Sequence, residues 1–264
     1  MKKITFRRLS LRLLSLMCLG MFACGNPYNR IKNNNSQPVT HGTWDELLHQ
    51  HVSPEGAVHY QGLLQDSLRL RQYLDQLGQN PPNNQNWTPD ERKAYFLNLY
   101  NAATVQLILR HYPVQSIKDI GPNLQIPFVR TPWTIPFIPI ADQKMTLDNI
   151  EHGIIRREFE DPRIHFAVNC AAHSCPVLHN RAYAGDRVNE QLDQQARQFI
   201  NDTRFNRITP DSIHISSIFK WYSGDFPKGK AFIDYLNQYS KVKINPNATV
   251  TYADYDWKLN ERNE

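Results

Sequence analysis

The sequence predicts an α+β fold: a single, mainly helical domain with a small mixed sheet. Apolar residues recur at helical spacing in several long segments, whereas the segments that resemble strands are short and scattered. Helices and strands do not alternate regularly, which argues against a doubly wound parallel sheet, and no internal repeat is present. About 220 residues follow the N-terminal segments, enough for one sizeable domain, expected over residues 44–264.

Two helices are expected early in the domain. Residues 44–52 form a short amphipathic segment, and residues 62–77 carry leucines and a tyrosine mostly three or four positions apart. Residues 80–86 are rich in proline and asparagine, so a break follows the second helix.

The best-specified helix begins after Thr88. Thr88 is the expected N-cap, Pro89 suits the first helical position, and Glu91 completes a capping box. The pattern continues to about His111, and Pro113 prevents further extension. The expected apolar stripe consists of Leu97, Tyr100, Thr104, Leu107, Ile108 and His111.

Two asparagines, Asn98 and Asn101, lie on or near this stripe. A buried amide without hydrogen-bond partners would cost about 1–3 kcal/mol, so each should have a partner. Two interpretations are open: the amides fasten a neighbouring loop, or they face a pocket and orient a catalytic group.

The second half of the chain mixes helices and strands. Five prolines over 121–140 forbid a helix there and favour short edge strands or a proline-broken hairpin. The next segments are expected to be a helix over 146–157, capped by Thr146, and a strand over 164–169. Four further elements are expected: helices at 186–201 and 231–239, and strands at 213–216 and 242–252.

Residues 1–24 resemble a secretory signal with a lipoprotein cleavage box. A basic start precedes a short apolar core, which is too short for a lasting transmembrane helix. The core ends at Met21-Phe22-Ala23-Cys24, where Cys24 would be the lipidated residue; ordinary cleavage with a free Cys24 is the alternative. Gly25 in the next position favours the outer membrane. We therefore expect a lipid-anchored protein of the bacterial cell envelope that faces the periplasm.

The charge excludes a nucleic-acid partner. The whole chain has a net charge of +5, but residues 1–23 hold five of the 30 basic side chains and none of the 25 acidic ones. The mature chain therefore has 25 of each sign and no basic surface for nucleic acid. Residues 25–43 are polar and predict a flexible tether. No glycine-rich phosphate loop occurs, and we expect no cofactor.

Thiol chemistry is the most specific functional indication. Outside the leader, the cysteines are Cys170 and Cys175. They are the ends of a six-residue segment that also contains His173. Cys170 follows the expected strand, and Pro176 suits the start of a helix, so the thiol would lie at a strand-to-helix turn. A cysteine nucleophile needs a lowered pKa, and such a turn favours this. A hydrolase or acyltransferase acting on a small molecule or peptide is the first hypothesis.

The base is harder to identify. His165 is five residues from Cys170, about 16 Å along a strand and on its opposite face, so it is a poor direct partner. His152 comes from a separate helix and is the preferred base. Glu151 beside it should point elsewhere on that helix than His152 does, and it is a candidate binding or orienting residue. Arg156 is either a solvated helix end or a ligand for an acidic group.

Other uses of the cysteines are open. A short-loop Cys170–Cys175 disulfide would make the domain a tethered binding or structural module. Redox exchange is weaker, because four residues rather than two separate the cysteines. A zinc site built from these cysteines with His165 and His173 has irregular spacing, so we expect no metal.

Several short sequence motifs together resemble the family called domain of unknown function 547, over roughly residues 45–260. They contain, in order, Asn98, Tyr100 and Asn101; Glu151 and His152; Pro162 through Cys170; Cys175 and Pro176; Trp221, Tyr222 and Asp225; and Tyr255 and Trp257. The resemblance implies a domain that is often exported in bacteria and has no settled activity. It implies that these positions share one site, to which His173 does not belong.

Overall fold

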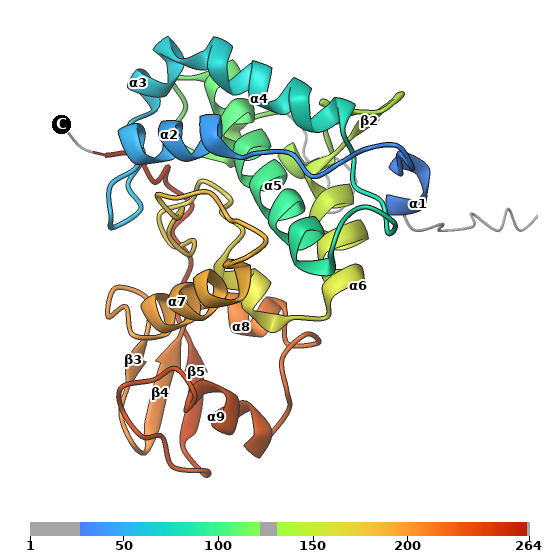
Figure 1. Cartoon of the computed structure of the whole chain (residues 1–264). Coiled ribbons are helices and arrows are strands. Elements are labelled where there is room, and N and C mark those ends of the chain that lie inside the picture. The colour runs from blue at the N-terminus through green and yellow to red at the C-terminus, as the bar shows by residue number, and fades with distance from the viewer. Residues whose placement is uncertain (1–26, 122–130, 263–264) are drawn as a thin grey trace, which may run out of the picture.

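The computed structural model describes residues 27–121 and 131–262. Helices predominate in these residues, and the strands form one two-stranded and one three-stranded sheet (Figure 1). The expected α+β, mainly helical class is confirmed.

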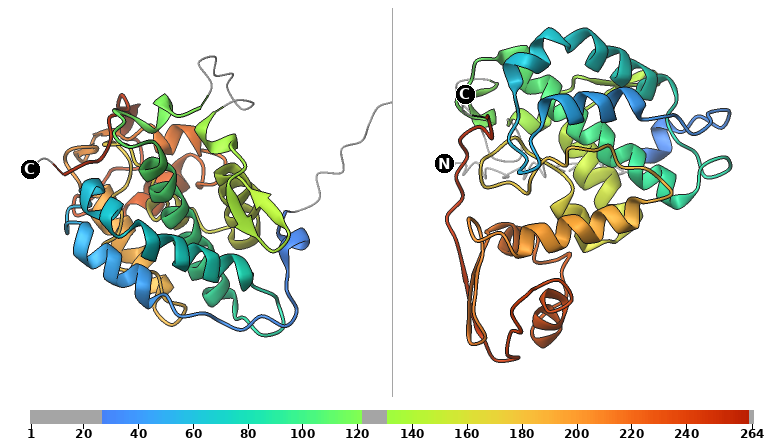
Figure 2. Two further views of the ribbon diagram at one scale, coloured as in Figure 1. Left: turned by 90° about the horizontal axis from the view of Figure 1, so that it is seen from above. Right: turned by 60° about the vertical axis from the view of Figure 1, so that its left-hand side comes forward.

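The helix α5 (Pro89–His111) is the centre of the larger core. The expected capping box is present: the Glu91 N–H donates to the Thr88 hydroxyl at 3.2 Å, and the Thr88 N–H donates to Glu91 Oε2 at 2.7 Å. All residues from Lys93 to Leu109 are buried, whereas His111 is exposed. The expected stripe was too narrow, because other helices pack on several sides of α5 (Figure 2).

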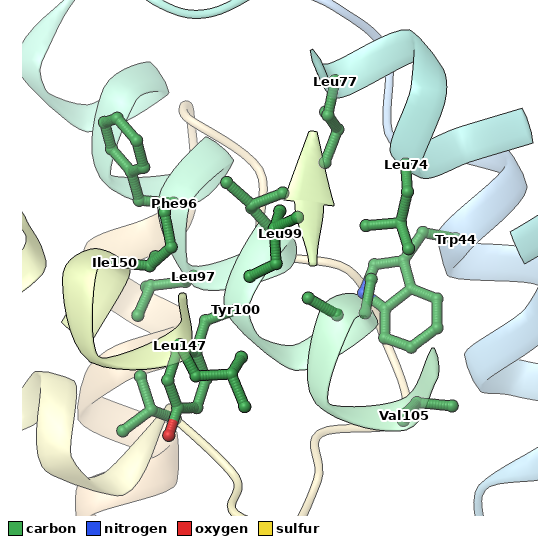
Figure 3. Close-up of a cluster of buried hydrophobic side chains, with 14 of the residues drawn as sticks. Trp44, Leu74, Leu77, Phe96, Leu97, Leu99, Tyr100, Val105, Leu147 and Ile150 are labelled. Carbon is green, nitrogen blue, oxygen red and sulfur yellow. The ribbon is translucent and has the colours of Figure 1, made fainter. Parts of the chain in front are cut away.

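Three helices lie between residues 42 and 79, directly before α5: α2 (Gly42–His51), α3 (Tyr60–Gln65) and α4 (Ser67–Gln79). The single helix expected over 62–77 is therefore two, separated at Asp66, whose carboxylate lies 2.7 Å from His51 Nε2. Figure 3 shows Trp44 of α2 and two α4 leucines, Leu74 and Leu77, beside the α5 side chains. Burial of these large apolar side chains is the main stabilising contribution of this layer.

Within the segment 25–43, where a flexible tether was expected, the described residues from 27 onward include a part that packs on the domain. Residues Tyr28–Ile31 form the short helix α1, and both named side chains are buried. The Tyr28 ring meets Phe96 edge to face at 5.5 Å, and its hydroxyl donates to Asn84 at 3.0 Å. Two apolar side chains three positions apart are sufficient to fasten this segment to α5. Cys24 and the rest of the leader lie outside the described residues.

The middle of the chain contains η1 (Ile117–Asp119), η2 (Pro132–Thr134) and a hairpin. The hairpin consists of β1 (Ile138–Ile140) and β2 (Gln143–Met145), which pair antiparallel. A short proline-containing hairpin is what the sequence predicted for the end of this segment. Residues 122–130 lie outside the described part of the chain.

Two segments near the thiols differ from expectation. The helix expected over 146–157 begins as a π-helical segment, η3 (Asn149–Ile155), and continues as α6 (Arg156–Phe159). The strand expected over 164–169 is wrong: its first half belongs to a 3-10 helix, η4 (Pro162–Phe166). The Asp161 side chain caps this helix by accepting the Arg163 N–H at 3.1 Å, and Pro162 occupies its first position.

The C-terminal part has its own smaller core around Phe166 and Phe219. Strand β4 (Ser212–Ile215) pairs antiparallel with β3 (Arg207–Ile208) and parallel with β5 (Thr249–Tyr252), so the expected mixed sheet is present. The helices here are α7 (Val188–Ile200), α8 (Ile218–Trp221) and α9 (Lys230–Leu236). Figure 1 shows this sheet at the end of the molecule opposite α2 to α4.

No helix of the described residues combines the length and the apolar character that a bilayer crossing requires.

Candidate functional site

A pocket of about 670 Å³ lies between the two cores and contains both cysteines. We call it the thiol pocket. Its charged and thiol side chains are Asp148, Glu151, His152, Arg156, His165, Cys170 and Cys175, and its aromatic side chains are Tyr100, Trp133, Trp221, Tyr222, Tyr255 and Trp257. These residues come from α5, η2, η3, α6, η4, α8 and the loops around them. A concave site with a few convergent polar groups is typical of a ligand pocket.

The loop that presents Cys170 is fixed by side-chain amides. The Asn169 Oδ1 accepts the Ala171 N–H at 2.9 Å, and the Asn169 Nδ2 donates to the Pro176 carbonyl at 2.8 Å. Ala171 has a φ of 63°, a left-handed conformation that is strained for a residue with a Cβ atom. The loop is held in this tight turn by local hydrogen bonds rather than by glycine.

Both cysteines are free thiols, with Sγ atoms 3.1 Å apart. The Tyr255 hydroxyl lies 3.2 Å from Cys170 Sγ. The hydrogen bond from Cys175 lowers the pKa of Cys170, and Tyr255 adds to this against the opposing effect of burial. Burial, followed by the interaction with Cys170, raises the pKa of Cys175. Cys170 is therefore the thiol that ionises first, and Cys175 stays protonated beside it.

His165 forms a dyad with an acid that is distant in sequence. Its Nε2 lies 2.7 Å from Asp225 Oδ2, and its ring packs on Tyr222 with centroids 4.0 Å apart. The residue is 2 % exposed, and its Nδ1 has no hydrogen-bond partner among the described residues. Burial lowers the pKa of His165, which favours the neutral ring. With the proton on Nε2 facing Asp225, Nδ1 carries the lone pair.

Arg156 holds the acid of this dyad. Its guanidinium makes a bidentate pair with Asp225, including an Nη2–Oδ1 contact of 2.7 Å. Burial raises the pKa of Asp225, but the hydrogen bonds from Arg156 and His165 outweigh it and leave that pKa lowered. Asp225 is thus ionised, and Arg156 is neither a merely solvated helix end nor free to neutralise an acidic ligand.

Glu151 and His152 both line the thiol pocket, although Glu151 was expected to point elsewhere. The π-helical turn of η3 changes the directions that α-helical spacing predicts. Glu151 is 4 % exposed and accepts the Tyr222 hydroxyl at 2.6 Å. Its carboxylate also interacts with Tyr100, whose pKa is raised first by burial and then by Glu151.

His152 does not have the contact that a base for Cys170 would need. Among the described residues, no hydrogen bond joins it to that thiol. Its Nδ1 accepts from Arg156 Nη1 at 3.0 Å, because arginine can only donate. His152 therefore lies in the pocket with its Nδ1 lone pair already used.

Asn98 and Asn101 fasten loops rather than face the pocket. Asn98 donates to the Tyr183 carbonyl at 2.8 Å and accepts the Tyr183 N–H at 2.9 Å. Asn101 donates to the Ala167 carbonyl and accepts the Asn169 N–H, both at 2.9 Å. The interpretation that they contact a ligand is not supported, although Asn101 positions the loop that carries Cys170.

One side of the pocket is an aromatic wall, which we define as Trp133, Trp221, Tyr255 and Trp257. Trp221 and Trp257 are stacked with centroids 5.9 Å apart, and Tyr255 lies 4.8 Å from Trp221 and 4.6 Å from Trp257. Trp221 is 50 % exposed, which is unusual for a tryptophan side chain. Tyr255 thus links the thiol to the exposed aromatic surface.

His173, between the two cysteines in sequence, points away from this arrangement. Its side chain is 54 % exposed and lies 3.8 Å from an Asp256 carboxylate oxygen. The described residues contain no group of three or more His, Cys, Asp or Glu side chains arranged to hold a metal ion.

Comparison with known proteins gives one match. Residues 84–200 match a model of the family described as "Protein of unknown function, DUF547", which supports the resemblance seen in the sequence. The matched region contains α5, η3, η4 and both cysteines, but not Asp225 or Tyr255. No curated protein and no solved structure matches the chain.

Proposed function

We propose that the thiol pocket is the active site of an exported cysteine hydrolase or acyltransferase. The single observation that carries this proposal is the environment of Cys170. A neighbouring thiol and a tyrosine hydroxyl both lower its pKa, and the cysteine lines an open pocket. A structural cysteine in an apolar core would have a raised pKa instead.

The reaction would proceed through a thioester. The Cys170 thiolate attacks the substrate carbonyl, a C–S bond forms, and the leaving group departs with its bonding electrons and takes a proton from water. The Tyr255 hydroxyl, 3.2 Å from the sulfur, is placed to donate to the carbonyl oxygen as it becomes negative. The acyl group is then bound to Cys170.

His165 replaces His152 as the proposed base. Its Nδ1 lone pair takes a proton from the water or amine that attacks the thioester, and the C–S bond breaks to restore the thiolate. The imidazolium then gives this proton to solvent, which neutralises the hydroxide formed when the leaving group was protonated. Asp225 accepts the Nε2–H, which fixes the tautomer and stabilises the imidazolium that forms. No hydrogen bond joins His165 directly to Cys170 among the described residues, so the attacking molecule would bind between them.

Alkylation tests the nucleophile. After mild reduction, the native protein is treated with iodoacetamide between pH 5 and pH 9, and modification of the Cys170 peptide is measured by mass spectrometry. We expect the rate to fall with decreasing pH around a midpoint below the usual value of about 8.5 for cysteine. Tyr255→Phe should raise that midpoint, because a donor to the thiolate is lost, whereas Tyr252→Phe in β5 should not.

Two outcomes would contradict the proposal. One is a Cys170 that reacts only after denaturation; the other is a midpoint at or above that of free cysteine. A Cys170–Cys175 bond that resists mild reductant would instead favour the alternative, a non-catalytic envelope module fastened by a disulfide. The observation that favours this alternative is the 3.1 Å separation of the two sulfur atoms, which is short enough for a disulfide to form with little movement.

We further propose that Cys24 anchors the chain to the membrane through a lipid, with the domain in the periplasm. The support is the basic and apolar leader that ends in Ala23-Cys24. In a bacterial host, cells labelled with a clickable palmitate analogue should yield a labelled protein, and Cys24→Ala should abolish the label. Cys18→Ala is the matched control and should keep it. A wild-type protein that is exported without label would contradict the anchor.

A further inference from the structure

We propose that the thiol pocket takes substrates that carry a positively charged aliphatic amine. This inference rests on the proposed function in so far as the thiol pocket is the substrate site. It adds a substrate class, argued from the charges and the aromatic wall of the pocket.

The charges of the pocket favour a cation. Glu151 is buried, and its hydrogen bonds come from tyrosine hydroxyls rather than from a cationic side chain. Asp148 is a second carboxylate in the lining, but burial raises its pKa, so it carries less negative charge than an exposed aspartate. Cys170 ionises more readily than an ordinary cysteine.

The groups that could oppose these negative charges are already engaged or neutral. Arg156 is paired with Asp225, and His165 favours its neutral form. His152 lies 4.0 Å from a Glu151 oxygen and 3.8 Å from an Asp148 oxygen, so a protonated His152 would offset no more than one of the two carboxylates. Among the described lining residues, the balance is therefore negative, which disfavours an anionic ligand and attracts a cation.

The aromatic wall can bind the same cation through its ring faces. Two rings of the pocket already contact cationic side chains of the protein. Lys118 Nζ lies 5.0 Å from the Trp257 centroid, and the Arg156 guanidinium lies 5.2 Å from the Tyr222 centroid. The half-exposed Trp221 has no such cation among the described residues. An ammonium group between this ring and the carboxylates would be attracted from both sides.

The unpartnered Nδ1 of His165 points to the same conclusion. A buried nitrogen with a lone pair requires a donor, and a protonated amine or the water that accompanies it is a donor. The volume of about 670 Å³ is sufficient for such a group together with the acyl chain bound to Cys170. The pocket thus combines a nucleophile, a negative charge and a cation-binding wall.

Binding to the catalytically silent Cys170→Ser protein tests this inference separately from catalysis. Cadaverine, 1-pentanol and pentanoate, which have the same carbon chain but different charge, are titrated by calorimetry and by tryptophan fluorescence. We expect cadaverine to bind at least about tenfold more tightly than the other two, and added salt to weaken its binding. Pentanol or pentanoate binding as tightly as cadaverine would overturn the inference.

Two substitutions in the Cys170→Ser background locate the site. Glu151→Gln removes the charge but keeps an acceptor for Tyr222, and Trp221→Leu removes the ring; each should weaken cadaverine binding about tenfold. The matched controls, Asp75→Asn on the exposed side of α4 and Tyr252→Leu on β5, should leave it unchanged.

The two proposals fail in different ways. Affinity that survives both pocket substitutions, or a neutral disaccharide that binds more tightly than cadaverine, would overturn the amine inference. If cadaverine binds as expected but Cys170 resists alkylation, the substrate class stands and the cysteine-enzyme proposal fails.

Discussion

Replacing His165 with alanine is expected to stop release of the acyl group from Cys170 and to trap the protein as a thioester. Attack by water on the thioester needs a base, and Nδ1 of His165 is the nitrogen whose lone pair no described residue uses. A positioned general base contributes about 10²- to 10⁴-fold to such a step. Formation of the thioester should be affected much less, because the pKa of Cys170 is lowered by Cys175 and Tyr255 rather than by His165.

Kinetics with p-nitrophenyl acetate separate these two steps. The wild-type protein should release a burst of p-nitrophenol and then turn over steadily. His165→Ala should give the burst and then almost stop, and intact-mass analysis should show one added acetyl group on most molecules. Cys170→Ser should show neither the burst nor turnover.

Two further variants control for structure. Because His165 packs on Tyr222, truncation could loosen the pocket, so Asp225→Asn is measured beside it; this change keeps the ring but removes the charge that stabilises the imidazolium. It should slow deacylation by a smaller factor. His173→Ala removes an exposed histidine outside the pocket lining and should behave as wild type. If His165→Ala turns over like the wild type, His165 is not the base.

The sequence was sufficient to predict the elements whose signals are local. The capping box at Thr88 and the length of α5 follow from four or five residues read in order, and the structure confirms both. The prolines of 121–140 predicted short edge strands or a hairpin instead of a long helix. Where this segment is described, it contains the short 3-10 helix η2 and the strand β1, which pairs with β2. The cysteine pair drew attention to the pocket that contains it, because cysteine is otherwise confined to the leader.

The proposed base, His165, was set aside by the same kind of reasoning, because that reasoning assumed a strand that the structure does not contain. Alternation along a strand put His165 on the face opposite to Cys170, yet the chain turns through η4 and both residues line one pocket. The local signal was available: Asp161 before Pro162 is a typical helix start. The apolar run that follows favoured a strand, and helix and strand are hard to distinguish in runs of that length.

The residues that contact His165 and Cys170 could not be predicted from local sequence patterns. Asp225 is 60 residues from His165, and Tyr255 is 85 residues from Cys170, so only the folded chain brings them together. The motifs that resemble the family included both positions, which was a hint that they share a site. Their roles as the acid of the dyad and the donor to the thiol required the structure.

Asn101→Ala is expected to lower the free energy of unfolding by about 2–6 kcal/mol, one of the largest stability effects we expect from a single polar side chain here. The substitution leaves the Ala167 carbonyl and the Asn169 N–H buried without their partners, and each such group costs about 1–3 kcal/mol. The gain in helix propensity from alanine, at most about 0.7 kcal/mol, is too small to compensate. Urea unfolding followed by circular dichroism measures the loss.

Asn98→Ala is the matched comparison, because Asn98 lies one helical turn earlier and makes the same two kinds of bond to Tyr183. Both variants should be destabilised, but only Asn101→Ala should also change the pH midpoint of Cys170 alkylation, since Asn101 fastens the loop that carries this thiol. Asn101→Asp keeps the acceptor for Asn169 and loses the donor to Ala167, so its stability should be intermediate. It also provides a folded protein if the alanine variant is too unstable to study. Equal midpoints in the wild type and in both Asn101 variants would show that the loop around Cys170 does not depend on this amide.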